Sequence, residues 1–115
     1  MTDQIVFFQR KDHVRESSQH VVTATFRDRE SADEVTPTNV RYRIDCLTTC
    51  TQILDWTVAT PGESVEITIT PTQNAMQDQC NSREVRQLTV AADYGLSSQF
   101  LDSVTFELEN VRGVS

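Results

Sequence analysis

The chain has few of the residues on which several common functions depend. Among its 115 residues there are only three glycines and one lysine, Lys11. So few glycines leave no glycine-rich loop that could hold a phosphate. A formal net charge of −7 opposes binding to the nucleic-acid backbone or to an anionic membrane surface. We therefore expect neither nucleic acid nor a membrane among the partners.

Long apolar runs are also absent. No segment approaches the roughly 20 apolar residues that a membrane-spanning helix needs. The first residues, Met-Thr-Asp-Gln-Ile-Val-Phe-Phe, lack the basic stretch and the long apolar segment of a secretory signal. We expect a protein made in the cytoplasm, where its thiols stay reduced.

The cysteines do not form a convincing metal site. Cys46, Cys50 and Cys80 are an odd number, so at least one is unpaired or bonded to another chain. Zinc usually takes four Cys or His ligands with a two-residue cysteine spacing. Here the spacing is three and no fourth ligand is assigned. The acidic segment 28–34 lacks the spaced oxygens of an EF-hand calcium loop. We predict no metal and no cofactor, and a disulfide from Cys80 to Cys46 or Cys50 remains an alternative.

Catalytic patterns are missing as well. The chain contains neither Gly-X-Ser-X-Gly nor His-Glu-X-X-His. His13 and His20 lie in a polar N-terminal stretch, where we expect them to face solvent rather than to act as bases. We therefore predict no catalytic residues and no enzymatic activity.

The clearest structural signal is the segment 63–70, Glu-Ser-Val-Glu-Ile-Thr-Ile-Thr. Its apolar and polar residues alternate strictly, as in a strand with one buried face. The same two-residue period predicts strands at 20–27, 38–45, 53–58, 63–70, 83–94 and 104–110, separated by turn signals such as Pro61-Gly62.

The strand pattern predicts an all-β fold of one domain. Six strands, or seven with an N-terminal one, with turn signals every 8 to 12 residues, are typical of an immunoglobulin-like antiparallel β-sandwich of about seven strands. The inward faces supply the predicted core: Val22, Phe26, Val40, Tyr42, Ile44, Trp56, Val65, Ile67, Ile69, Leu88, Val90, Val104, Phe106 and Leu108.

Residues 1–19 differ from the sandwich domain predicted over 20–115. Ile5, Val6, Phe7 and Phe8 form one apolar cluster, which a polar stretch follows. Two interpretations stay open. The cluster is either the first strand of the sandwich or an arm that docks onto a neighbouring subunit.

Two further sets of side chains are candidates for binding a partner. Arg41 and Arg43 alternate with core residues and therefore share the outer face of one sheet. They either bind an acidic patch or pair with glutamates on neighbouring strands. Phe100 and Leu101 are placed in the last hairpin loop, where apolar side chains either contact a partner or fold back over the core.

Several segments carry a family resemblance. Residues 35–45 (Val-Thr-Pro-Thr-Asn-Val-Arg-Tyr-Arg-Ile-Asp) and 88–95 (Leu-Thr-Val-Ala-Ala-Asp-Tyr-Gly) resemble motifs of fibronectin-type-III-like and bacterial immunoglobulin-like modules. Together with 53–58 and 63–71, they resemble short immunoglobulin-like proteins of tailed bacteriophages over residues 20–111. The chain departs from that pattern in the Cys46–Cys50 connection and in the polar segment 72–82.

The resemblance implies a non-enzymatic virion structural protein. A capsid decoration or cement protein that binds the major capsid protein is the first expectation, with a homo-oligomer as an open alternative to a monomer. A tail, tail-tip or fibre-attachment protein is the second. A carbohydrate-binding or adhesion module is the third. Against this last alternative, Trp56 and Tyr42, the aromatic side chains that would form a sugar platform, are both predicted to point inward.

Overall fold

A computed structural model gives the fold, and it describes residues 4–10, 13–28, 35–78, 80–94 and 99–110. These residues contain eight strands and no helix. The strands are β1 (Gln4–Gln9), β2 (His13–Arg15), β3 (His20–Asp28), β4 (Asn39–Cys46), β5 (Thr51–Ala59), β6 (Ser64–Ile69), β7 (Arg83–Asp93) and β8 (Gln99–Glu109).

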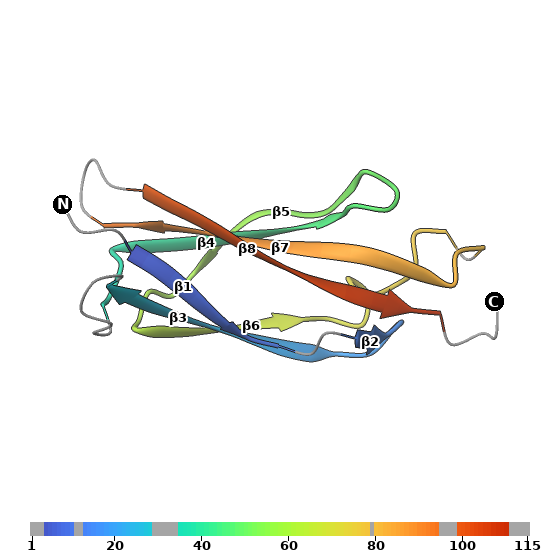
Figure 1. The fold of residues 1–115 in the computed structure, drawn as a ribbon, viewed down its shortest axis with the longest axis horizontal. Coiled ribbons are helices and arrows are strands. Elements are labelled where there is room, and N and C mark those ends of the chain that lie inside the picture. The colour runs from blue at the N-terminus through green and yellow to red at the C-terminus, as the bar shows by residue number, and fades with distance from the viewer. Residues whose placement is uncertain (1–3, 11–12, 29–34, 79, 95–98, 111–115) are drawn as a thin grey trace.

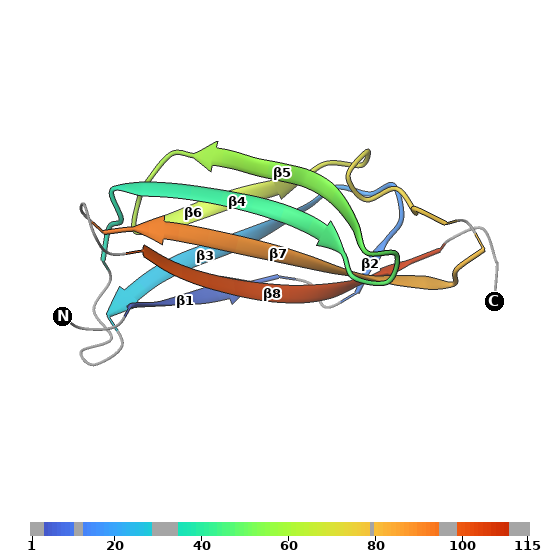
Figure 2. The same ribbon diagram turned by 90° about the horizontal axis from the view of Figure 1, so that it is seen from above.

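The strands form two sheets that pack face to face (Figure 1). One sheet has the order β1-β3-β6 and the other has the order β2-β8-β7-β4-β5. Figure 2 shows the outer side of the larger sheet, with β5, β4, β7 and β8 side by side. The predicted all-β sandwich is confirmed, with eight strands among the described residues in place of about seven and with one parallel pair, β2 and β8.

The N-terminal segment is divided between both sheets. β1 pairs antiparallel with β3, whereas β2 pairs parallel with β8 in the other sheet. Residues 4–9 are thus a strand of the sandwich, and the interpretation as a free arm is wrong for them. Val6 and Phe8 pack against the core, while Phe7 is 48% exposed on the outer face. The side chain of Ile5 lies outside what the structure describes.

The core lies between the two sheets and follows the two-residue period. Most of the residues predicted to point inward are buried, and Tyr42 and Val104 are half-buried against them. Met76 closes the core from the segment between β6 and β7. Trp56 is the exception, because its side chain is 37% exposed on the outer face.

A pair of β-bulges on β5 places Leu54 and Trp56 on opposite faces of the sheet. Tyr42 pairs with Thr57, but Ile44 pairs with Leu54, so β5 contains an extra residue between these two pairs. A second register shift follows between Ile44 and Asp45. Each shift of one residue exchanges inward and outward side chains. The two shifts cancel outside Leu54, so Gln52, Trp56 and Val58 face outward while Leu54 packs on the core, and the prediction of an inward Trp56 is wrong.

The last hairpin also differs from its prediction. β8 begins at Gln99, so Phe100 and Leu101 belong to the strand rather than to a loop. Phe100 contacts the ring of Tyr94 edge to face, with 5.7 Å between the ring centroids. Burial raises the pKa of Tyr94 to about 12. Leu101 points outward and is 61% exposed.

A charge pair lies inside the sandwich at the start of β7. Glu84 and Arg86 are both fully buried, and the Arg86 Nη2 donates to Glu84 Oε1 over 2.8 Å. The guanidinium also donates to the carbonyl oxygens of Gln73 and Ala75, each over 2.7 Å. Arg86 therefore binds the segment between β6 and β7 to the sheet.

The carboxylate of Glu84 binds backbone N–H groups of the same segment between β6 and β7. It accepts hydrogen bonds from the backbone N–H groups of Gln77 (3.0 Å) and Asp78 (2.8 Å). Burial acts to raise the pKa of Glu84. The hydrogen bonds from Arg86 and from these two amides, with the positive charge of Arg86, outweigh burial, so the pKa is lowered.

A second polar group links the same segment to β3. Asn74 is fully buried, and its Nδ2 donates to the carbonyl of Ser18 (2.8 Å) and lies 3.0 Å from His20 Nδ1. The His20 ring packs edge to face on Phe106. The prediction of a solvent-exposed His20 is wrong, because this histidine is 6% exposed and belongs to the core.

Phe7 and Phe8 give a matched test of the N-terminal strand. We expect Phe8→Ala to lower the free energy of unfolding by about 2–3 kcal/mol, since it removes packing from the core. Phe7→Ala should change it by less than about 1 kcal/mol, because Phe7 faces solvent. Urea denaturation measures both, and equal effects would contradict the orientation of β1.

Glu84→Gln tests the buried pair. We expect the free energy of unfolding at pH 7 to fall by about 3–5 kcal/mol, because Arg86 loses its buried countercharge. Glu66→Gln, at an exposed position on β6, is the matched control. Because the pKa of Glu84 is lowered in the folded protein, its contribution to the free energy of unfolding is fully present at pH values above its ordinary pKa of 4.5. That contribution is lost as the pH falls from 4.5 through the lowered pKa. Denaturation at several pH values should show that the difference in the free energy of unfolding between the wild type and Glu84→Gln becomes smaller below pH 4.5. A difference that stays constant with pH would contradict the stabilising role of the Glu84 carboxylate.

Candidate functional site

The outer face of the five-stranded sheet gathers exposed apolar and cationic side chains. The register places Val58, Arg41, Ala91 and Leu101 in one row across β5, β4, β7 and β8. Neighbouring strands lie about 4.8 Å apart, so the row spans about 14 Å. We call this surface the Trp56 face, because Trp56 lies beside the row on β5.

Two arginines surround the indole ring. The Cζ atom of Arg41 lies 5.2 Å from the ring centroid of Trp56, and that of Arg43 lies 5.7 Å from it. Both distances are within the range of a cation–π interaction. The ring restrains two flexible cations on the sheet surface, which reduces the entropy that they would lose on binding.

The two arginines differ in their remaining partners. Arg43 makes a forked contact with Asp45, with distances of 3.0 Å and 2.7 Å, and its Nη2 also donates to Gln52 over 3.2 Å. The hydrogen bond to Asp45 raises the pKa of Arg43. Arg41 makes no ion pair with any residue that the structure describes, so its charge is left for a partner.

The apolar members of the Trp56 face are well exposed. Val58 is 80% exposed and Leu101 is 61% exposed, and each lies toward one end of the row. Trp56 is 37% exposed on β5, two residues from Val58 and next to the arginines of β4. Aromatic and arginine side chains are enriched in protein interfaces and in their energetic hot spots. The Trp56 face thus has the composition of a protein-binding surface.

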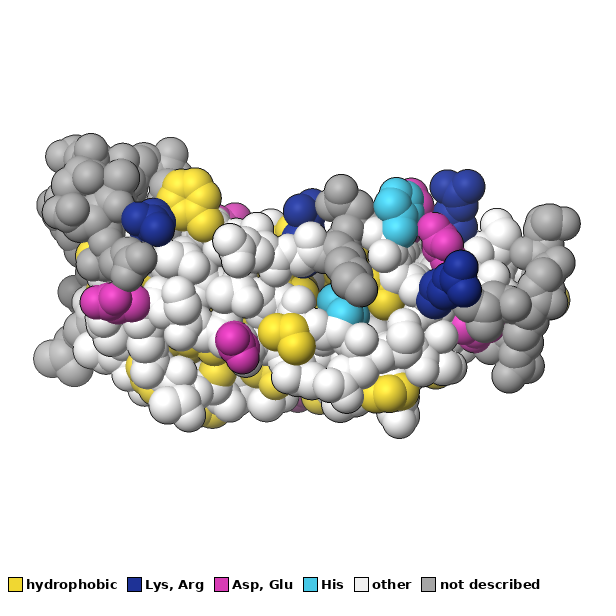
Figure 3. All heavy atoms as spheres, turned by 90° about the horizontal axis from the view of Figure 1, so that it is seen from below, with side chains coloured by type: hydrophobic (Ala, Val, Ile, Leu, Met, Phe, Trp, Pro, Cys, Tyr) yellow, Lys and Arg dark blue, Asp and Glu magenta, His cyan; other side chains and the backbone are white. Residues whose placement is uncertain are grey.

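The outer face of the three-stranded sheet is different in character. Figure 3 shows it as a mostly uncharged polar surface with scattered apolar and charged side chains. Thr25 of β3 and Ser64 of β6 share a hydrogen bond of 3.0 Å on this face. Phe7 and Val21 are its exposed large apolar side chains among the described residues. Phe7 of β1 pairs with Thr25 of β3, which is four residues along the strand from Val21, so the two apolar side chains are well separated. This face is the weaker candidate for an interface.

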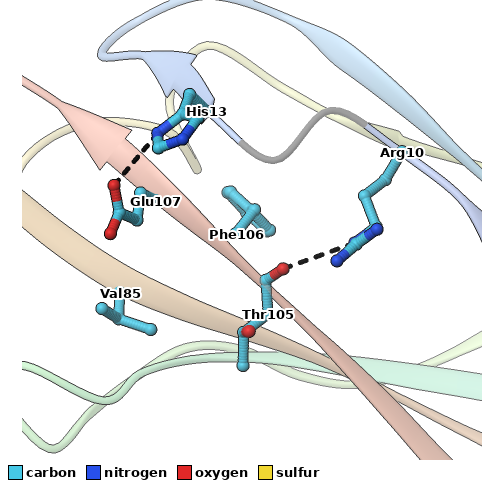
Figure 4. A pocket seen from close by; sticks show the side chains of 6 residues that line it. All are labelled: Arg10, His13, Val85, Thr105, Phe106 and Glu107. Carbon is cyan, nitrogen blue, oxygen red and sulfur yellow. Dashed lines mark hydrogen bonds and ion pairs between the residues drawn. The ribbon is translucent and has the colours of Figure 1, made fainter.

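A hollow of about 320 Å³ lies where the N-terminal segment meets β8. It is lined by Arg10, His13, Val85, Thr105, Phe106 and Glu107 (Figure 4). His13 Nδ1 lies 3.0 Å from Glu107 and 3.4 Å from Glu109, and Arg10 donates to a β8 carbonyl over 3.4 Å. These contacts hold β2 against β8.

The search for metal sites gives no candidate within the described part of the chain. There, no group of three or more His, Cys, Asp or Glu side chains is arranged to hold an ion. Cys46 is buried, Cys50 and Cys80 are exposed, and all three are free thiols. The acidic residues 29–34 lie outside the described residues. In the same part of the chain, no helix has the length and apolar character to span a membrane.

The structure brings some of the predicted binding residues together and separates others. Arg41, Arg43 and Leu101 share the Trp56 face, whereas Phe100 packs inward beside Tyr94. Val6 and Phe8 belong to the core, and Phe7 lies on the opposite sheet.

Trp56 and Val58 were absent from the predicted set. The consecutive apolar pair Ile53-Leu54 carried the signal, because two neighbouring side chains that both pack on the core break strict alternation and indicate a bulge.

Comparisons with known proteins add no relative. The chain matches no family model, and none of the curated proteins matches it either. The argument for function therefore depends on the residues and on the geometry of the site.

Trp56 is the only tryptophan, so its fluorescence reports on this face alone. We expect Arg41→Glu to lower the quenching constant for iodide and to raise that for caesium, each by roughly twofold at low ionic strength. The reason is that the local potential at the ring becomes negative. Acrylamide is uncharged, so its quenching constant serves as the reference for both ions. Arg27→Glu, on the opposite sheet, should leave all three quenching constants unchanged. Equal changes in the two variants would contradict the position of Arg41 over Trp56.

Proposed function

We propose that this chain is a non-enzymatic binding module that docks on another protein through the Trp56 face. The observation that carries the proposal is the row of Val58, Arg41 and Leu101 beside an exposed tryptophan. A broad sheet surface with an aromatic residue, a stacked arginine and exposed aliphatic side chains suits a protein partner.

The setting that we propose is the bacteriophage virion, on the basis of the resemblance of residues 20–111. In this proposal the chain is a capsid decoration or cement protein, and its partner is the major capsid protein. A modest contact repeated around a particle gains strength through avidity. The contact uses the Trp56 face, and no longer an arm formed by Ile5 to Phe8, because residues 4–9 are a strand of the sandwich. The alternative within this proposal is a position on the tail or tail tip, where each virion would carry only a few copies of the chain.

Carbohydrate binding is the second candidate, and one observation favours it. The sequence pattern placed Trp56 inside the core, which left no aromatic platform for a sugar. The ring is instead partly exposed, with the polar side chain of Gln52 close to Arg43. Binding of the isolated protein to a glycan array, abolished by Trp56→Ala, would favour this function over protein docking.

Copy number in purified particles tests the setting. We expect a stained gel of purified virions to contain the chain in numbers comparable to the major capsid protein. A handful of copies per particle would move the proposal to the tail. Absence from purified particles would reject the virion setting altogether.

Leu101→Glu tests the face itself. We expect it to weaken binding to particles that lack the chain by about tenfold or more, since it places a charge within the apolar part of the contact. Phe7→Glu, at an exposed position on the opposite sheet, is the matched control and should bind normally. Cosedimentation with the particles measures both, and loss of binding only in Phe7→Glu would show that the other sheet is the interface.

A further inference from the structure

We infer that the docking partner presents a carboxylate to Arg41, with apolar side chains around it. This inference rests on the proposed function and adds the chemistry of the partner. An aspartate or glutamate on the partner would occupy the position over the row between Val58 and Leu101, beside the ring of Trp56.

The contrast between the two arginines identifies Arg41 as the recognising group. Both stack on the same indole, yet Arg43 already shares its guanidinium with Asp45 and Gln52. Arg41 has the ring as its contact and no carboxylate within the described part of the chain. A forked guanidinium held in this way matches the two oxygens of a carboxylate.

Burial of the face makes such a partner necessary. Arg41 lies inside the row, with Val58 on one side and Ala91 and Leu101 on the other. Ala91 is already buried, so the exposed apolar side chains of the row are Val58 and Leu101, and a protein that covers them must also remove water from the guanidinium. Removing water from an unpaired charge is costly, so a partner that fits this face supplies a countercharge.

The shape of the face favours a protein over a small molecule. Ligand sites are usually concave. Of the hollows beside His13, around Ser18 and along β5 and β6, only the last includes a residue of the row, Val58, and neither Arg41 nor Leu101 lines any of the three. A second copy of this chain is disfavoured because each copy carries a net charge of −7, and like charges repel.

Arg41 variants test the inference on particles prepared without the chain. We expect both Arg41→Glu and Arg41→Gln to weaken binding by about thirtyfold or more, with a thermal transition close to that of the wild type. Arg41→Gln should also reduce the dependence of binding on salt, because one ionic contact is lost. Arg27→Glu is the matched control, because Arg27 stacks on the exposed Phe7 of the opposite sheet. It should bind as the wild type does.

The outcomes separate the inference from the function on which it rests. If the wild type does not bind particles, the proposed function and this inference both fail. If the wild type binds and Arg41→Gln binds equally well, only the carboxylate contact is wrong. A wild-type dimer in sedimentation that Arg41→Glu dissociates would identify a second copy as the occupant and overturn the inference. Glycan-array binding that depends on Arg41 would overturn it in favour of a sugar.

Discussion

The sandwich depends on an ion pair that lies between its sheets. Glu84 and Arg86 occupy two inward positions of β7, where the alternation would otherwise place apolar residues. Their charges are tolerated because each group also bonds the backbone of the segment from Gln73 to Asp78. A polar connection without regular structure thereby becomes a fixed cap at one end of the core, and Asn74 within it extends the network to β3.

The candidate interface has a different physical origin. It exists because Gln52, Trp56 and Val58 of β5 lie on the same outer face as the arginines of β4, whereas Leu54, which lies between two bulges, turns into the core. There the ring meets the two arginines of β4, which strict alternation had already placed outside. The edge strand thus adds an exposed aromatic residue to a sheet surface whose Arg41 has no acidic partner among the described residues.

The N-terminal strands complete the sandwich on its other side. β1 extends the smaller sheet and β2 extends the larger one, so these two strands contribute to both layers. This division explains why Phe7 and Phe8, neighbours in an apolar cluster, have different roles. One faces solvent and the other packs on the core. The apolar segment that the sequence offered as a docking arm is largely used for packing inside the sandwich. The proposed docking surface is therefore on the larger sheet.

The sequence by itself determined the strand class, most strand positions and the inward faces of β3, β4, β6 and β7, because side-chain direction in a regular strand depends only on local alternation. The same alternation placed Arg41 and Arg43 outside. Tertiary structure alone decided the side of Trp56, the pairing of β1 and β2 with different sheets, and the burial of Glu84 and Arg86. Each of these depends on which residues lie opposite one another across distant segments. Register, bulges and countercharges are properties of such pairs, and a single strand pattern does not contain them.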